Sequence, residues 1–289
     1  MCLPFYVVKN QINQKNQVKI IIQTFPHYFN QQLCHYIMEY FVDENSIVRK
    51  IWSKSDTILF IFAGAAAEFA LNKAVDWLYF TGKLPADPIG RLFSTVAYAR
   101  QIVFLENEKA LAAIDRIKSI HGEVEKNRAA HIPDWAYRDV LFMLIHYSIS
   151  SFELLERKLT DEEKEEVYAL FYRLGTRMEL KNLPANYIEW LPVREEHLLQ
   201  DLEKSKYSVD LFSQYKKHLG SFRYFILIQS QKMVVPKRVS ELLQFGKFSL
   251  LTPVLPFYKL TDKLNASWII KEIILPAKYK LQIKNLDNR

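Results

Sequence analysis

Glycine and cysteine are scarce in this chain of 289 residues, which has 7 glycines and 2 cysteines. So few glycines disfavour a β-sandwich with many tight turns and leave no glycine-rich loop to hold a phosphate. Cys2 and Cys34 form no C-x-x-C pair, so a zinc ribbon lacks its ligands and a thioredoxin-like site its redox pair. Nothing in the sequence requires a disulfide, which fits a reducing compartment such as the cytoplasm.

Long hydrophobic runs are also absent. The longest apolar run spans residues 58–67 and ends at Glu68, whereas a membrane-spanning helix needs about 20 apolar residues. We therefore expect a buried helix at this place. The first residues show no basic flank followed by a long apolar stretch, so we predict no signal peptide.

The formal net charge of +7 is concentrated at the C-terminal end of the chain. Residues 232–289 contain 11 Lys or Arg and 4 acidic residues. A nucleic-acid-binding domain would instead show a basic face on its folded part, so we predict no nucleic-acid partner. The tail mixes its lysines with apolar residues such as Phe257 and Trp268. That mixture fits either a solvated extension or a peripheral contact with an anionic membrane.

The apolar pattern between residues 37 and 240 is helical throughout. Asp87-Pro88 is typical of a helix start, and Thr160 with Glu163 forms a capping-box pattern before an apolar run. Later in the chain we expect a short helix over 187–191 and further helices over 195–204, 207–219 and 222–234. No segment shows the clear alternation of a strand. We predict an all-α fold: one large helical domain over 37–240, after a poorly specified lead-in (1–36) and before a basic extension (241–289).

Several enzyme classes lack their signatures here. The sequence contains no G-x-G-x-x-G, no G-x-x-x-x-G-K-[ST], no G-x-S-x-G and no H-E-x-x-H. None of the seven histidines has a glutamate three residues before it, and this disfavours the helical di-iron sites that use that spacing.

Two histidines lie on helix faces that we expect to be buried. His121 continues an apolar stripe of a predicted helix that begins at Asn107, and His146 lies inside an almost wholly apolar stretch. A neutral imidazole that projects into an apolar pocket is a standard haem ligand. A hydrogen-bonded core histidine gives the same pattern and is commoner, so the pattern leaves both interpretations open. Arg91 and Thr95 are four residues apart and share a helix face.

At these residues the chain resembles the catalytic domain shared by bacterial rubber oxygenases (latex-clearing proteins) and the fungal MpaB-type oxygenase of mycophenolic acid biosynthesis. The resemblance runs from about Phe41 to Val239. Three motifs carry it, and their order and spacing are more specific than each motif alone. They are the arginine–threonine helix at 87–95, the I-H-x-x-V sequence at 120–124, and an aspartate that leads a buried helix with a histidine, at 139–146.

The resemblance implies a single large helical domain with a globin-like core that holds one b-type haem. It implies that His121 is the iron ligand and that Arg91 and Thr95 line the haem pocket, with His146 as a further candidate for contact with the cofactor. Glu68 is the buried-looking carboxylate that we assign as a candidate catalytic group. The implied reaction is an O₂-dependent oxidative cleavage of a carbon–carbon double bond in an apolar small molecule, such as an isoprenoid.

Two alternatives remain at this stage. A non-enzymatic carrier of haem or of a hydrophobic ligand would share the fold and the pocket, and His146 would then be the second iron ligand. An interaction protein without a cofactor would use His121 and His146 as ordinary core residues and its basic tail as a docking segment.

Overall fold

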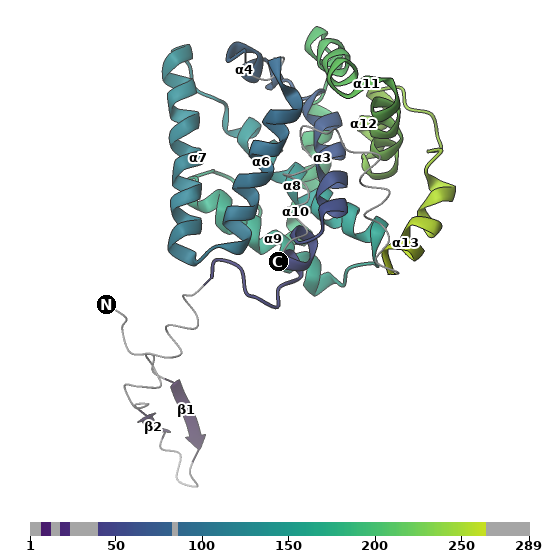
Figure 1. Cartoon of the computed structure of the whole chain (residues 1–289). Helices are drawn as coiled ribbons and strands as arrows, with labels where there is room; N and C mark the ends of the chain where they lie inside the picture. Colours follow the sequence, from purple (N-terminus) through teal and green to yellow (C-terminus); the bar gives the residue numbers. More distant parts are fainter. Residues whose placement is uncertain (1–6, 13–17, 24–39, 83–85, 264–289) are drawn as a thin grey trace.

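The computed structural model describes residues 7–12, 18–23, 40–82 and 86–263. Helices make up the domain from residue 47 onward, which confirms the predicted all-α fold (Figure 1). In the lead-in, β1 (Val7–Ile12) pairs antiparallel with β2 (Val18–Gln23), with Val7 opposite Gln23. The alternation pattern did not indicate these strands, although β-branched residues that favour strands occur in both.

The helices follow one another with short connections. In chain order they are α2 (Ile47–Trp52), α3 (Ser55–Phe69), α4 (Val75–Phe80), α6 (Pro88–Phe104), α7 (Asn107–Arg128), α8 (Asp134–Leu155), α9 (Asp161–Arg177), α10 (Tyr187–Gln200), α11 (Lys206–Val234), α12 (Lys237–Leu242) and α13 (Leu255–Lys263), with a 3₁₀ turn at Thr252–Val254. No helix in the described part of the chain has the length and apolar character needed to cross a membrane.

Side-chain caps explain where several helices begin. The Asp87 carboxylate accepts a hydrogen bond from the Gly90 N–H at 2.9 Å, and Pro88 occupies the first turn of α6. Thr160 and Glu163 form the predicted capping box, each accepting a hydrogen bond from the other's backbone N–H, at 3.2 and 3.0 Å. These caps can be predicted from the sequence because each depends on residues three positions apart.

The centre of the core is the contact between α3 and α8, which pack closely along their lengths. Gly64 makes this approach feasible, because a Cβ at that position would lie 2.2 Å from Cε1 of the fully buried Tyr147. The small residues after Phe62 therefore accommodate an aromatic side chain of the neighbouring helix. Trp52, Trp190 and Phe142 fill the surrounding space.

Helices α6 and α7 form an antiparallel hairpin at one side of the domain (Figure 1). Only Leu105 and Glu106 connect them. Because the connection is so short, residues equally far from it lie opposite each other on the two helices.

One long helix differs from the predicted segments and another agrees with them. Helix α10 continues through Pro192, where the sequence predicted a short helix that ends at residue 191. Helix α11 consists of two helical segments that meet at a kink at Gly220, whose φ of 74° is non-helical, and this agrees with the helices predicted over 207–219 and 222–234. Glycine adopts this conformation without steric cost. Trp268 and most of the basic tail lie outside the described residues.

Candidate functional site

The α6/α7 hairpin brings Arg91 and His121 together. Arg91 lies 13 residues before the end of α6, and His121 lies 14 residues after the start of α7, so the two occupy matching levels of the antiparallel pair. Burial lowers the pKa of His121 and the positive charge of Arg91 lowers it further, so the two side chains lie within electrostatic range of each other. Two of the residues predicted for the haem site therefore lie near each other.

The imidazole of His121 is neutral and has an unused nitrogen. Burial is the main cause that lowers the pKa of His121, and the charge of Arg91 adds to it. The Nδ1 atom is buried and has no well-aligned hydrogen-bond partner, although a backbone hydrogen bond with Ile117 acts against these two causes and raises the pKa. The ring of Tyr137 meets the His121 ring edge-on, with 5.2 Å between the ring centroids. A buried imidazole nitrogen without a well-aligned hydrogen bond is uncommon in a native core, and a neutral imidazole keeps one nitrogen lone pair for a metal ion.

The second half of α7 is less covered than the first. Ala110, Ala113 and Ile114 are buried, whereas Ile117, Ile120, His121 and Val124 are partly exposed. Thr95, on α6, is exposed, and its hydroxyl donates to the carbonyl of Arg91 at 3.2 Å. The predicted pocket residues Arg91, Thr95 and His121 thus lie along the more open half of the hairpin.

Glu68 lies in a different cluster, in the core between α3, α8 and α10. Its Oε2 accepts hydrogen bonds from the Tyr147 hydroxyl at 2.8 Å and from Nη2 of Arg194 at 2.6 Å. Glu68 is 1% and Arg194 is 3% exposed. Although burial opposes it, the charge of Glu68 raises the pKa of Arg194 above its usual range. The carboxylate is therefore engaged in a buried ion pair with Arg194 and not with Arg91.

His146 belongs to the surroundings of that ion pair. Burial, together with the charge of Arg194, lowers the pKa of His146 to about 3. Its Nε2 is buried and has no hydrogen-bond partner. Tyr137, which contacts His121, precedes His146 on α8 by nine residues, or about 13 Å of helix. The two histidines thus have separate environments, one beside Arg91 and the other beside Arg194.

A third group of polar side chains joins α8 to α10. His197 Nδ1 contacts a carboxylate oxygen of Asp139 and lies 3.3 Å from Oδ2 of Asp201. The other Asp139 oxygen accepts from the Asn72 amide at 2.6 Å. One imidazole nitrogen and two carboxylates at this spacing could hold a cation. In the present arrangement a hydrogen bond already occupies the histidine nitrogen, unlike that of His121.

Sequence reasoning missed Arg194, His197 and Asp201, although a signal was available. These residues share one face of α10 with the buried Trp190, at spacings of four, three and four. Polar residues that continue an apolar stripe point into the core and need partners there. The signal was overlooked because the sequence pattern predicts two helices here, over 187–191 and 195–204, which would place Trp190 and His197 on separate helices.

Comparison with known proteins identifies the family of the chain. Residues 52–259, most of the helical domain, match the family described as "ER-bound oxygenase mpaB/B'/Rubber oxygenase, catalytic domain". No curated protein matches the chain. The matched segment includes the α6/α7 hairpin, both histidines and the buried clusters. The chain belongs to the mpaB/rubber oxygenase catalytic domain family, whose activity is that of an oxygenase.

Proposed function

We propose that this chain is a haem-b-dependent oxygenase in which His121 is the iron ligand. The observation that carries the proposal is the buried, unpartnered Nδ1 of His121 opposite Arg91, inside a domain of an oxygenase family. A haem, when bound, supplies the activation of O₂ that the side chains of the chain cannot perform.

The residues around His121 suit this group. A lowered pKa keeps the imidazole neutral at pH 7, and only a neutral imidazole has a lone pair for a metal. The guanidinium of Arg91 is a permanent cation beside the site, and it could pair with a carboxylate of the haem edge. Within the described part of the chain, Arg91 forms no ion pair with an acidic side chain.

Tyr137 and Glu125 would hold the imidazole in position. The Tyr137 hydroxyl donates to Oε1 of Glu125 at 3.2 Å, and its ring stands perpendicular to that of His121. The same Glu125 oxygen accepts from the backbone N–H of Ile132 at 2.9 Å, which fixes the connection between α7 and α8. His121 therefore lies against a ring that is attached to α8 at one end and hydrogen-bonded to Glu125 at the other.

The substrate that we propose is an apolar alkene, such as an isoprenoid chain. The partly exposed Ile117, Ile120 and Val124 give the open half of α7 an apolar surface beside His121. Such a surface favours a hydrocarbon over a charged substrate.

The first test is the absorption spectrum of the protein after reconstitution with haem. Wild type is expected to show an intense Soret band, and His121→Ala to lose or shift it. His218→Ala, on an exposed part of α11, is the matched control and should resemble wild type. In a His121→Gly variant, added imidazole should restore the wild-type band. A colourless wild type, or equal spectra of His121→Ala and His218→Ala, would contradict the proposal.

The second test addresses the reaction. Haem-loaded protein with squalene as a probe alkene is expected to consume O₂ and to release carbonyl-containing fragments, and Arg91→Ala should lower the rate without removing the Soret band. Haem binding without any O₂ consumption on a panel of isoprenoid alkenes would leave haem carriage as the function.

The contact of the C-terminal extension with a membrane remains a separate prediction. Phe248, Leu250 and Phe257 are 82%, 67% and 63% exposed, and Lys247 lies among them. Co-sedimentation with vesicles that contain anionic lipid should decrease when the chain is shortened to end at Val239. Equal sedimentation of both chains would exclude this contact.

A further inference from the structure

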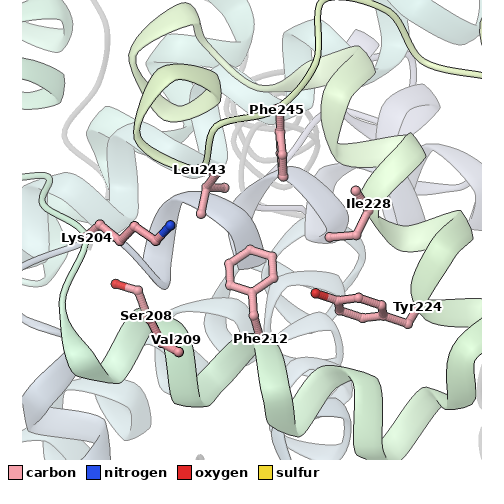
Figure 2. A pocket seen from close by; sticks show the side chains of 8 residues that line it. All are labelled: Lys204, Ser208, Val209, Phe212, Tyr224, Ile228, Leu243 and Phe245. Carbon is pink, nitrogen blue, oxygen red and sulfur yellow. The ribbon is translucent and has the colours of Figure 1, made fainter.

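A cavity of about 430 Å³ lies where α11 bends (Figure 2). Both halves of α11, Lys204 just before the helix and the segment after α12 contribute to its wall. The lining includes Lys204, Phe212, Tyr224, Ile228, Leu243 and Phe245. Its volume falls within the range of small-molecule pockets, about 300–1,000 Å³. Figure 1 shows α12 and α7 on opposite sides of the helical domain, so the cavity is separate from the His121 site.

Two polar groups of the lining have no protein partner. Lys204 is an exposed residue and the charged member of the lining, and its ammonium group extends toward the middle of the cavity (Figure 2). The Tyr224 hydroxyl also points inward. Within the described chain, neither side chain has a hydrogen bond or an ion pair. Burial raises the pKa of Tyr224, so its hydroxyl stays protonated and can donate. The neighbouring Ser208 hydroxyl, in contrast, already accepts from the Ser205 N–H at 2.9 Å.

We propose that this cavity binds an apolar chain that ends in a carboxylate, as a fatty acid does. A carboxylate only accepts hydrogen bonds and carries a negative charge, which suits a lining whose polar groups are an ammonium group and a hydroxyl donor. The aliphatic and aromatic side chains would cover the hydrocarbon part. A cationic amphiphile would be repelled by Lys204, and an uncharged hydrocarbon would leave both donors without an acceptor.

The bend at Gly220 gives the cavity its shape. It sets Phe212 in the first half of α11 against Tyr224 and Ile228 in the second half. A Cβ at Gly220 would meet no atom within 4 Å, so a substitution there acts through the backbone alone. Gly220→Ala disfavours the positive φ and should weaken ligand binding without filling the cavity.

Calorimetric titration of the full chain with dodecanoate, below its micelle concentration, tests the proposal. We expect saturable binding of one dodecanoate. Lys204→Gln should weaken it about tenfold and Tyr224→Phe about threefold, as expected for the loss of a charged and of a neutral hydrogen bond. Lys216→Gln, on an exposed part of α11, is the matched control and should bind like wild type. His121→Ala should also bind like wild type, which separates this test from that of the oxygenase site.

Further ligands and one filled cavity sharpen the result. Dodecanol should bind about tenfold more weakly than dodecanoate, and Ile228→Trp should abolish binding while its circular dichroism spectrum stays helical. The proposal is overturned if dodecanoate shows no saturable binding, if Lys204→Gln equals Lys216→Gln, or if Ile228→Trp binds like wild type. Tighter binding of dodecyl phosphate than of dodecanoate would overturn the assignment to a carboxylate.

Discussion

The α6/α7 hairpin and the α3/α8/α10 core differ in how their charged side chains are paired. In the core, Glu68 is bound by both Arg194 and Tyr147, and almost no part of the ion pair is exposed. In the hairpin, Arg91 lies near the partly exposed His121, whose Nδ1 has no well-aligned partner. A paired buried charge contributes to a unique fold, whereas a cation beside a partly exposed imidazole can take part in binding a ligand. The comparison associates stability with the Glu68–Arg194 pair and the proposed chemistry with the hairpin.

The largest effect is expected from removal of the cation of the core pair. Arg194→Met leaves the Glu68 carboxylate buried without a counter-charge, and the free energy of unfolding should fall by about 3–5 kcal/mol. Urea denaturation measures this loss. Arg177→Met removes an exposed pair with Asp115 of α7, at 2.6 Å, and should change the free energy of unfolding far less, because water and salt screen exposed charges. A double variant, Glu68→Leu with Arg194→Met, should recover most of the loss, and a double variant as unstable as Arg194→Met would contradict this explanation.

A pair of glycine substitutions compares the packing of the two regions. Gly64→Ala would place a methyl group against the Tyr147 ring and should cost about 2–3 kcal/mol, because that ring is fully buried. Gly122→Ala, in α7 beside His121, meets no atom within 4 Å and should instead stabilise the protein by about 0.5–1 kcal/mol. Thermal unfolding of both variants measures the difference. Equal changes in both would show that the hairpin is packed as tightly as the core.

His146 makes the core sensitive to acid. Burial and the charge of Arg194 lower its pKa to about 3 in the folded protein, against 6.5 for an unburied histidine. Between these values the unfolded chain binds a proton that the folded chain does not, so stability is lost as the pH falls below about 6.5. At pH 5 the loss relative to pH 7 should be about 2 kcal/mol. His146→Leu should remove this component and His218→Leu should keep it. Urea denaturation at pH 5 and pH 7 measures this loss of stability. A loss in His146→Leu as large as that in wild type would refute the assignment.

The smallest effect concerns the coupling inside the hairpin. Arg91→Gln removes a positive charge that lowers the pKa of His121, so this pKa should rise. Titration of the histidine ring protons by NMR, in protein without haem, measures the shift. Arg116→Gln, on the exposed face of α7, is the control. No difference between the two variants would mean that Arg91 and His121 are not electrostatic neighbours.

The sequence predicts the helices better than it predicts their polar contacts. Asp87, Thr160 and the start at Asn107 are local signals, and the structure has helix boundaries at those places. The placement of Arg91 opposite His121 also follows from a short connection and regular helices. The pairing of Glu68 with Arg194, 126 residues later, depends on how three helices pack, and no local pattern encodes it.

Pro192 and Gly220, both of types that usually end helices, behave differently. Pro192 lacks an N–H, but it lies near the start of α10, and the helix continues because Trp190, Arg194 and Leu198 are buried along one face. Gly220 is non-helical and marks the kink between the two helices that the sequence predicted. In α10 tertiary packing overrides a local preference, whereas in α11 the local preference of glycine prevails and the kink shapes the wall of a cavity.

The two-residue link between α6 and α7 has a consequence for motion. A hairpin so tightly joined can tilt or loosen as one unit, and its local opening would appear in hydrogen exchange as a single cooperative segment. Arg91 lies on α6 and His121 on α7, so a rigid movement of the hairpin would carry both residues together. Entry to the site could then widen or narrow on a slow timescale while the spacing between guanidinium and imidazole stays constant.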